Sequence, residues 1–558
     1  MPSLNWIGRE AVERHHTTVP FHMLREDPAR SFGDADSRNL LVEADNLLAL
    51  RTLLPYYAGQ VKCIYIDPPY NTGKQTWAYN DNVDSPIIQE WLREALAGRQ
   101  IDENDLSRHD KWLCMMYPRL ILLHQLLHEQ GVIWVSIDDT ELANLMQLMD
   151  VVFFPSNRLG VVVWKNATDN NPTRVSVEHE YILCYAKDQR KVRPAWKEKE
   201  PLAKQRMLAK YYELKQAHAD LTQVQGAFRR FIRDNSEDLQ PLTHYNRIDE
   251  NGPYTGSRKV HNPGREGYHF DAIHPQTGHP CVEPTRGYRF PETTYRRLLA
   301  EGKILFGRDH TQIIQMKEYL ADYQGSLKSV IDLDGRTGAN TLEAIFGNRT
   351  TFRNPKSVEI ITSLLSFTTD SGDLVLDSFA GSGTTGHAVQ QLNKQDGGNR
   401  RFILVEMEPA IAGPITAERL RRVSAGYGDT PGLGGGFRYC TLGPTLFDGD
   451  GRIRPEISFD ELARFVFFRE TGAPMPEREG RSPLLGIRNG LGVYLLYNGI
   501  LKDKSADGGN ALTRRALAQL PAHDGAKVIY GTSCRIGAER LLRESIAFRH
   551  IPLDLRVE

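Results

Sequence analysis

Three glycines and two carboxylates around residue 380 form the pattern with the clearest chemical meaning in this sequence. Gly381, Gly383 and Gly386 satisfy G-x-G-x-x-G within LVLDSFAGSGTTGHAV, and Glu406 follows 20 residues after the last glycine. A glycine loop between a strand and a helix brings backbone amides close to an anionic group at the helix N-terminus. His387 stands where a nucleoside-triphosphate loop has its lysine, so the sequence does not predict such a loop.

Asp377 separates the cofactors that this loop could hold. It ends the strand-like run LVLD, where a dinucleotide would place its anionic pyrophosphate. A carboxylate there repels phosphate but attracts the ammonium of S-adenosylmethionine (AdoMet), whose own carboxylate would face the loop amides. Glu406 would accept hydrogen bonds from the ribose hydroxyls, each worth about 1.5–3 kcal/mol. We therefore expect AdoMet and no metal, with cofactor ligands among Asp377, Phe379, Gly381, Ser382, Gly383, Thr384 and Glu406. A glycine-rich turn without a ligand and a nicotinamide-dependent oxidoreductase remain alternatives.

The turn Asp67-Pro68-Pro69-Tyr70 is the second candidate site. It follows the apolar run VKCIYI, which is typical of a buried strand. A four-residue pattern of this kind arises by chance only about a few times in a thousand chains of this length. A rigid diproline turn capped by an aromatic ring is the purely structural alternative.

Together, the turn and the glycine loop resemble the DNA amino-methyltransferases, whose signature is (Asp/Asn/Ser)-Pro-Pro-(Tyr/Phe). The resemblance implies that the carboxylate of Asp67 and the carbonyl of Pro68 accept the two N–H bonds of an exocyclic amine. The diproline backbone holds this carbonyl rigid, and the amine lone pair then points at the sulfonium methyl. Tyr70 would stack on a base that has left the duplex, a contact worth about 1–3 kcal/mol. The implied catalytic residues are Asp67, Pro68, Pro69 and Tyr70.

The order of the motifs resembles one subclass of these enzymes, the β class. The turn precedes the glycine loop by about 300 residues, and TFRNPKSVEIITSLL (351–365) precedes the loop as the family's motif X does. The resemblance implies a circularly permuted, Rossmann-like methyltransferase sheet, and it places Asp45 against the AdoMet adenine. Asp-Pro-Pro-Tyr implies adenine-N6 rather than cytosine-N4 as the target, with the latter as the alternative. The extension Asn71-Thr72-Gly73 is similar to modification subunits of Type III restriction–modification systems. This implies double-stranded DNA, a homodimer and a helicase–nuclease restriction subunit as partners.

The elements that position these residues indicate a doubly wound α/β fold. Strand-like runs at 61–67, 131–139, 161–166 and 180–187 alternate with a helical stretch at 112–130, in which Pro118 marks an irregular start or kink. We expect a catalytic half at 1–190, a target-recognition insert with a helical linker at 191–340, an AdoMet half at 341–440, and a small α/β domain at 441–558. Phosphates or guanine edges could be contacted by insert arginines, namely Arg258, Arg265, Arg286, Arg289, Arg296 and Arg297.

Composition excludes several other classes of protein. The 558 residues are 40% hydrophobic and 25% charged, with a net charge of −1, so any DNA-binding surface must come from local charge. Residues 187–238 hold 13 Lys and Arg against 8 Asp and Glu, a local excess of +5. No apolar run is long enough to span a membrane, no secretory signal is visible, and the six cysteines are too scattered for a disulfide framework. These features predict a cytoplasmic protein.

His124 and His128, four apart on the expected helix, lack a third metal ligand, and Cys281 lacks the partner motifs of a nucleophile.

Overall fold

The chain forms two compact units in a computed structural model of all 558 residues. The first unit comprises Met1–Pro194 with Lys328–Glu558, and the second comprises Ala195–Leu327. The structure describes residues 4–555 except 34–36, 73–107, 168–174, 199–201, 237–238, 258, 263, 478–479, 498–499 and 502–508. Gly73 and Arg258, which the sequence analysis named, lie outside the described residues.

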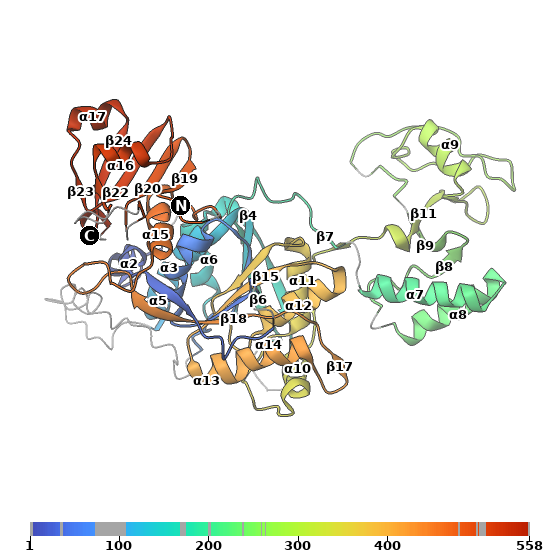
Figure 1. Cartoon of the computed structure of the whole chain (residues 1–558). Coiled ribbons are helices and arrows are strands. Elements are labelled where there is room, and N and C mark those ends of the chain that lie inside the picture. The colour runs from blue at the N-terminus through green and yellow to red at the C-terminus, as the bar shows by residue number, and fades with distance from the viewer. Residues whose placement is uncertain are drawn as a thin grey trace. The chain divides into compact units, whose positions relative to one another are not determined.

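A ten-stranded sheet is the framework of the first unit (Figure 1). Its strand order is β1 (His22–Glu26), β18 (Arg438–Thr445), β2 (Leu40–Glu43), β15 (Arg401–Glu406), β14 (Leu374–Asp377), β3 (Val61–Ile66), β4 (Leu127–Ile137), β6 (His179–Ala186), β5 (Arg158–Lys165) and β13 (Val330–Asp332). The six strands from β18 to β4 are parallel to one another, whereas β1 and β6 run antiparallel to their neighbours. A mainly parallel core of this kind needs helices on both faces.

Helices cover both faces of the sheet. Figure 1 shows α3 (Asn46–Tyr57), α5 (Arg108–Leu126) and α6 (Leu142–Phe153) on one side, and α11 (Val358–Thr368), α12 (Thr384–Asp396) and α14 (Glu418–Ala425) on the other. Alternate residues of the central strands pack with α3, α5 and α6, among them Ile64, Leu376 and Ile403. The residues between them are buried as well, as expected for strands covered on both sides. The predicted doubly wound α/β class is confirmed.

Strands β3 and β14 are neighbours at the centre of the sheet, with Leu376 opposite Ile64 in parallel register. The chain between them contains β4, β5 and β6 and the whole second unit. Sheet strands therefore come from both sides of an insertion, as the expected circular permutation requires. The carboxyl ends of β3 and β14 lie at the same edge, where open α/β sheets bind their ligands.

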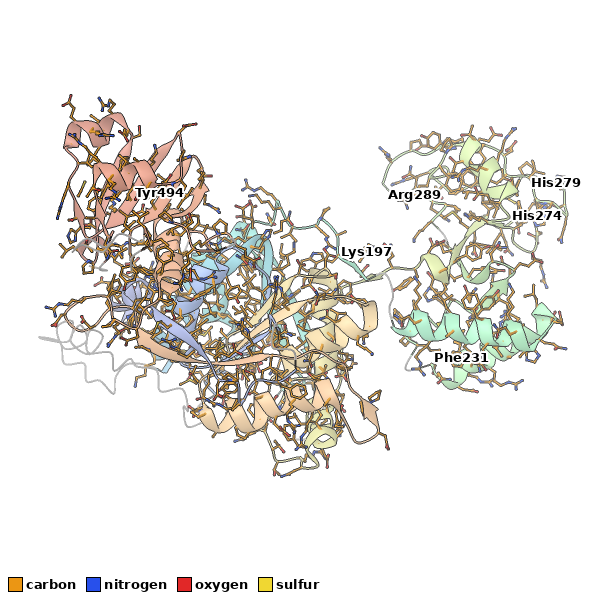
Figure 2. All side chains as sticks on the ribbon, viewed as in Figure 1. Lys197, Phe231, His274, His279, Arg289 and Tyr494 are labelled. Atoms are coloured by element: carbon orange, nitrogen blue, oxygen red, sulfur yellow. The ribbon has the colours of Figure 1, made fainter. Side chains whose placement is uncertain are left out.

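The second unit has a helical part and a mainly β part. The expected helical linker consists of two helices, α7 (Leu202–Ala217) and α8 (Leu221–Asp234), and the Asp220 side chain caps α8 by accepting from Thr222 N at 3.1 Å. A four-stranded sheet has the order β10 (Ile304–Leu305), β11 (Gln315–Tyr319), β9 (Gly252–Ser257) and β8 (Arg247–Asp249). Helix α9 (Glu292–Ala300) packs through Tyr295 and Leu298 on a small core with Tyr288. Figure 2 places Phe231 on α8 and Arg289 in the part that holds α9.

The C-terminal residues form a further α/β layer within the first unit. Its sheet has the order β19 (Leu484–Arg488), β20 (Leu491–Leu495), β22 (Ala526–Gly531) and β24 (Ile546–His550), and Tyr494 of β20 is labelled in Figure 2. Its core is shared with the N-terminal segment, because Phe21 and Met23 pack with side chains of α15 (Phe459–Thr471). The shorter helices of the first unit include α1 (Arg9–Val12), α2 (His15–Thr18), α10 (Arg336–Phe346), α13 (Pro409–Ile411), α16 (Arg514–Gln519) and α17 (Ala538–Arg543).

Several boundaries differ from the sequence prediction. Helix α5 contains Pro118 but ends at Leu126, and the chain continues directly into β4. His128 therefore lies on a strand, so the expected helical pair with His124 does not form. Strand β18 crosses residue 440 and α10 crosses residue 340, both of which were expected to lie at domain boundaries. The reason at 440 is hydrogen bonding, because β18 pairs with β2 inside the main sheet.

Gly386 tests how tightly α12 packs on the sheet. A Cβ atom at Gly386 would lie 2.7 Å from Leu420 Cδ2 and 3.0 Å from Leu404 Cδ1, and both leucines are fully buried. We expect Gly386→Val to lower the free energy of unfolding by about 1–3 kcal/mol through overpacking, measured by urea denaturation. The matched control is Gly160→Val on β5, where nothing lies within 4 Å of the added carbon. Equal stability of the two variants would contradict the close packing of Gly386 against Leu420 and Leu404.

Candidate active site

The turn after β3 is held by hydrogen bonds with two other parts of the chain, helix α5 and the residue before α6. Trp112 Nε1 of α5 donates to the carbonyl oxygen of Pro69 at 2.7 Å. Asn71, which has a left-handed backbone with φ 58°, donates through Nδ2 to Glu141 Oε1 at 2.5 Å. Glu141 is fully buried and also contacts His109 Nδ1 at 2.7 Å. The turn is therefore held rigid on both sides of Tyr70, as a preorganised acceptor requires.

Two residues that the sequence analysis did not single out complete this part of the site. The Tyr70 hydroxyl donates to Glu180 Oε2 at 2.9 Å, and Lys356 Nζ lies 3.2 Å from Asp67 Oδ1. Glu180 belongs to β6, and Lys356 lies two residues before α11. Lys356 falls in TFRNPKSVEIITSLL, which the resemblance to the family covered, and Glu180 begins the strand-like run at 180–187. Their positions along the chain give no sign that they meet Asp67.

The glycine loop is shaped by the side chain of Asp377 at the end of β14. Asp377 Oδ1 accepts from Phe379 N at 2.9 Å, and Oδ2 accepts from Thr385 Oγ1 at 2.5 Å. Gly381 and Gly383 have φ values of 49° and 79°, which glycine adopts without strain. The loop therefore turns tightly from β14 into α12, the geometry that the sequence pattern predicted.

Glu406 lies at the end of the adjacent strand and closes the loop from the other side. Its Oε2 accepts from Gly381 N at 2.8 Å, and its Oε1 accepts from Glu408 N at 3.0 Å. Burial raises the pKa of Glu406 to about 7 and that of Asp377 to about 7. Neither carboxylate forms an ion pair within the described part of the chain. Two buried carboxylates without a cationic partner suit a ligand that carries positive charge and disfavour a pyrophosphate.

The other predicted cofactor residues surround the same loop. Ser382 Oγ and Thr384 Oγ1 each accept from Nη1 of the fully buried Arg419, both at 2.9 Å. Phe379 is buried beneath the loop, with 4% of its surface exposed. Asp45 caps α3 by accepting from Leu47 N and Leu48 N, and it keeps 29% of its side chain exposed. The ends of β2, β14 and β15 thus bring the predicted cofactor residues to one edge of the sheet.

The two candidate sites are adjacent. Asp67 follows β3 directly, Asp377 ends β14, and the two strands are paired in parallel. The charge of Asp67 also contributes to the raised pKa of Asp377, after the larger effect of burial. Asp67 and Asp377 are 310 positions apart in the sequence, but they lie at the same edge of the sheet.

No group of three or more His, Cys, Asp or Glu side chains is arranged to hold a metal ion in the part of the chain that the structure describes. Cys281 is free and buried, and burial raises the pKa of its thiol. Across the same described ranges, no helix is long and apolar enough to cross a membrane.

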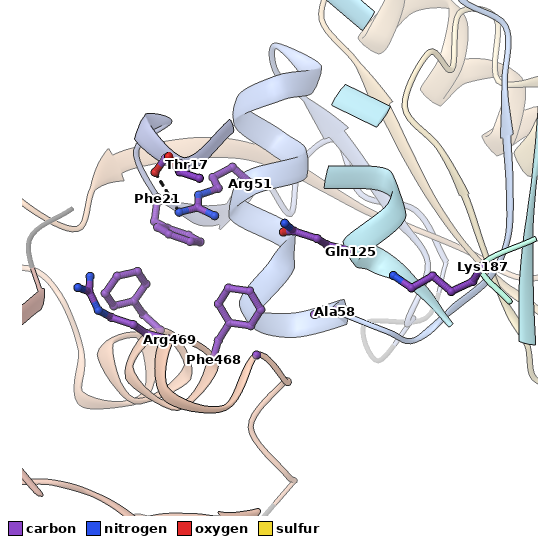
Figure 3. Close-up of a pocket in the computed structure, with 10 residues that line it drawn as sticks. Thr17, Phe21, Arg51, Ala58, Gln125, Lys187, Phe468 and Arg469 are labelled. Carbon is purple, nitrogen blue, oxygen red and sulfur yellow. Dashed lines mark hydrogen bonds between the residues drawn. The ribbon is translucent and has the colours of Figure 1, made fainter. Parts of the chain in front are cut away.

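A cavity of about 610 Å³ lies elsewhere in the first unit (Figure 3). Its lining combines the aromatic side chains of Phe21, Phe465 and Phe468 with cationic ones that include Arg51. Arg51 Nη2 donates to the Thr17 carbonyl at 3.2 Å, drawn as a dashed line in Figure 3. None of the predicted site residues lines this cavity, so it is separate from the candidate active site.

Known proteins of similar sequence include modification subunits of restriction-modification enzymes. The chain is 41% identical over 418 residues to the Mod subunit of the Type III restriction-modification enzyme EcoP15I from Escherichia coli, covering 73% of this chain and 64% of that protein. It is 33% identical to the StyLTI Mod subunit from Salmonella typhimurium, covering 70% and 57%. The chain thus spans less than two thirds of the length of these relatives.

A solved structure of a DNA modification methylase from Thermus thermophilus, complexed with S-adenosyl-L-methionine, aligns with 73% of this chain and 99% of that chain. Its identity is 14% and its TM-score is 0.33, values too low to support an argument about the site. The family model for DNA methylases that act on N6 or N4 matches residues 61–417, from the start of β3 to the segment that precedes α14. This match includes both halves of the candidate site and more than half of the chain, so the chain belongs to the N6/N4 DNA methylase family.

Proposed function

We propose that this protein is a site-specific DNA methyltransferase that moves a methyl group from S-adenosylmethionine to the exocyclic N6 amine of adenine. The observation that carries the proposal is the juxtaposition of the Asp67 turn and the Asp377 loop at the ends of paired strands. Direct transfer between two bound molecules needs proximity and alignment more than any covalent intermediate on the enzyme. The paired strands supply that alignment.

On the target side, Asp67 and the Pro68 carbonyl accept the two N–H bonds of the amine. An exocyclic amine is a poor nucleophile because its lone pair is delocalised into the ring, and two fixed acceptors draw it toward a tetrahedral shape. Asp67 Oδ1 is buried and accepts no hydrogen bond among the residues that the structure describes, so it has a free lone pair for this bond. Tyr70 supplies the ring on which the flipped base stacks.

On the cofactor side, the residues of the loop fit AdoMet. Asp377 and Glu406 are the anionic partners for its ammonium and ribose hydroxyls, the loop amides of Ser382 and Thr384 would face its carboxylate, and Asp45 would lie toward its adenine. When bound, AdoMet supplies a methyl group on a positively charged sulfur, which is activated for displacement. The chain's own task is to orient the amine and to exclude water from the reacting atoms.

Adenine is the preferred target because the turn begins with Asp, whereas Ser-Pro-Pro-Tyr is usual for cytosine-N4 enzymes of this class. The relatives named as Type III Mod subunits support a modification role within a restriction–modification system. We assign DNA recognition to the second unit, Ala195–Leu327, whose bounds are similar to those of the insert 191–340 expected from the sequence. Within it, Arg296 and Arg297 are engaged with Glu292 and Glu301 in exposed ion pairs, so Arg289 is a better candidate for DNA contact than either of them.

The partners follow from the same proposal. Double-stranded DNA is the substrate, and a homodimer and a helicase–nuclease restriction subunit are the protein partners that the family implies. A modification subunit that recognises the site for both activities would deliver the restriction subunit to unmethylated DNA.

Asp67→Asn tests the target side. The amide keeps the shape of the carboxylate but loses its charge and one acceptor, so transfer of labelled methyl from AdoMet to unmethylated genomic DNA should fall by about 10²–10³-fold. The control is Asp332→Asn, an exposed carboxylate on β13 with 75% of its side chain accessible, which should retain full activity. Nucleoside analysis of the product should show N6-methyladenine. N4-methylcytosine would reverse the choice of base, and equal transfer by both variants would remove the mechanism.

Calorimetry across pH tests the cofactor side. Asp377 and Glu406 have pKa values of about 7, and only their charged forms attract a cationic ligand. AdoMet affinity should therefore rise as pH increases from about 6 to about 7.5, approaching tenfold per pH unit below the pKa for each proton lost. Asp377→Asn should weaken binding at the higher pH and flatten this dependence. Affinity that increases toward acid, or NAD binding in place of AdoMet, would contradict the assignment.

A further inference from the structure

The ammonium of Lys356 lies at the centre of the target half of the site. Its Nζ is 2.8 Å from the Tyr70 hydroxyl and 3.0 Å from Glu180 Oε2, both as hydrogen bonds, and 3.2 Å from Asp67 Oδ1. It also lies 4.7 Å from the centroid of the Tyr70 ring. Only 11% of the lysine side chain is exposed, so water screens these contacts weakly.

Lys356 acts on Asp67 mainly through its charge, because the attraction between the two charges outweighs any hydrogen bond between them. Its hydrogen bonds go to Tyr70 and Glu180, while the buried Oδ1 of Asp67 accepts none from the described residues. The acceptor that the target amine needs is therefore unused although a cation lies beside it. A lysine that donated to Oδ1 would compete with the amine for this lone pair, whereas this arrangement leaves it available.

Glu180 fixes the lysine in this position. Its Oε2 receives hydrogen bonds from both Lys356 and Tyr70, so one carboxylate oxygen orients the cation and the stacking ring together. Glu180 comes from β6, opposite Trp164 of β5, and the Trp164 ring lies 5.9 Å from the ammonium. The four polar groups thus come from three separate segments: the turn after β3, strand β6 and the residues before α11.

The charges around Asp67 oppose one another. Burial raises the pKa of the Asp67 carboxyl, Lys356 lowers it, and Glu180 raises it. For Lys356 itself, the attraction of the two carboxylates outweighs the effect of burial, so its pKa is raised and it stays charged. Among the residues that the structure describes, the ionisable groups that interact with Asp67 are Lys356, Glu180, Tyr65, Tyr70 and, on the neighbouring strand, Asp377, and Glu180 also interacts with Asp138.

We propose that Lys356 is a positioning residue that keeps Asp67 ionised for methyl transfer, and that Glu180 anchors Lys356 and Tyr70 around it. The inference rests on the proposed methyltransferase function and adds two residues to its target site. A desolvated carboxylate left without this cation would take up a proton in the neutral range. A protonated Asp67 would present a hydroxyl in place of one of its acceptors, and the amine would lose a partner.

Substitutions of Lys356 and Glu180 should shift the pH profile of methyl transfer in opposite directions. The profile is measured in single turnovers at saturating DNA and AdoMet. Lys356→Met removes the cation, so the acid limb of the profile should move to higher pH. Glu180→Gln removes an anion but keeps an oxygen that can accept from Tyr70 and Lys356, so the acid limb should move to lower pH. A displacement of about one pH unit corresponds to about a tenfold change in rate on that limb. Lys356→Arg should restore most of the wild-type profile because it restores the charge.

Lys394→Met on α12 is the matched control, because it removes an exposed lysine far from Asp67 in the sequence and should leave the acid limb unchanged. Folding of every variant is checked by its melting temperature. The salt dependence of DNA binding is measured as well, because loss of a phosphate contact would reduce its slope by about one unit. An unchanged slope with opposite displacements of the acid limb supports the proposal.

Three other outcomes would contradict the proposed role of Lys356. If both variants moved the limb in the same direction, or if Lys394→Met moved it as far as Lys356→Met, Lys356 would not control the charge of Asp67. A reduced salt slope with an unmoved limb would make Lys356 a DNA contact instead. These failures require an active wild-type enzyme, whereas a wild type that methylates no DNA would refute the proposed function and this inference with it.

Discussion

The parallel pairing of β3 with β14 is the constraint on which the candidate site depends. It joins the carboxyl ends of two strands, and the acidic residues there, Asp67 after β3 and Asp377 at the end of β14, are 310 positions apart. The entropy of closing a chain segment grows only with the logarithm of its length, so a long insertion adds little to the cost. Part of that segment, Ala195–Leu327, folds into its own compact unit, and the remainder adds strands to the same sheet. The inserted unit is therefore compatible with the close pairing of β3 and β14.

Burial of carboxylates is the second common feature of the site. Asp67, Asp377 and Glu406 have pKa values raised by desolvation, and among the described side chains only Lys356 is placed to neutralise any of them. Such groups reduce the stability of the free protein, because burying a carboxylate favours its neutral form. In the proposed function, a cationic cofactor and an amine with two N–H donors are the partners of these carboxylates. The burial that raises their pKa values therefore also strengthens their attraction to such ligands.

Most of the correct predictions from the sequence came from short motifs and the apolar runs next to them. The Asp67 turn and the Gly381 loop were recognised because each motif follows an apolar strand in sequence. Lys356 and Glu180 could not be found this way, because their role arises only where β6 and the residues before α11 pack beside β3. Tertiary context also decided where α5 ends, since residues from Leu127 onward pair with β3 although LLHEQ has helical character. Contacts between distant segments, rather than propensity, determined each of these features.

The residues before α11 connect the two halves of the site through a short covalent path. A Cβ atom on Gly381 would lie 3.1 Å from the ring of Phe352, so this ring rests directly on the glycine loop. Four residues later, Lys356 lies beside Asp67 and Tyr70. Pro355 between them is buried, and the following helix is anchored in the core through Val358 and Ile361. One anchored segment therefore contacts both half-sites, through Phe352 at the glycine loop and through Lys356 beside Asp67. It connects the two half-sites in addition to the pairing of β3 with β14.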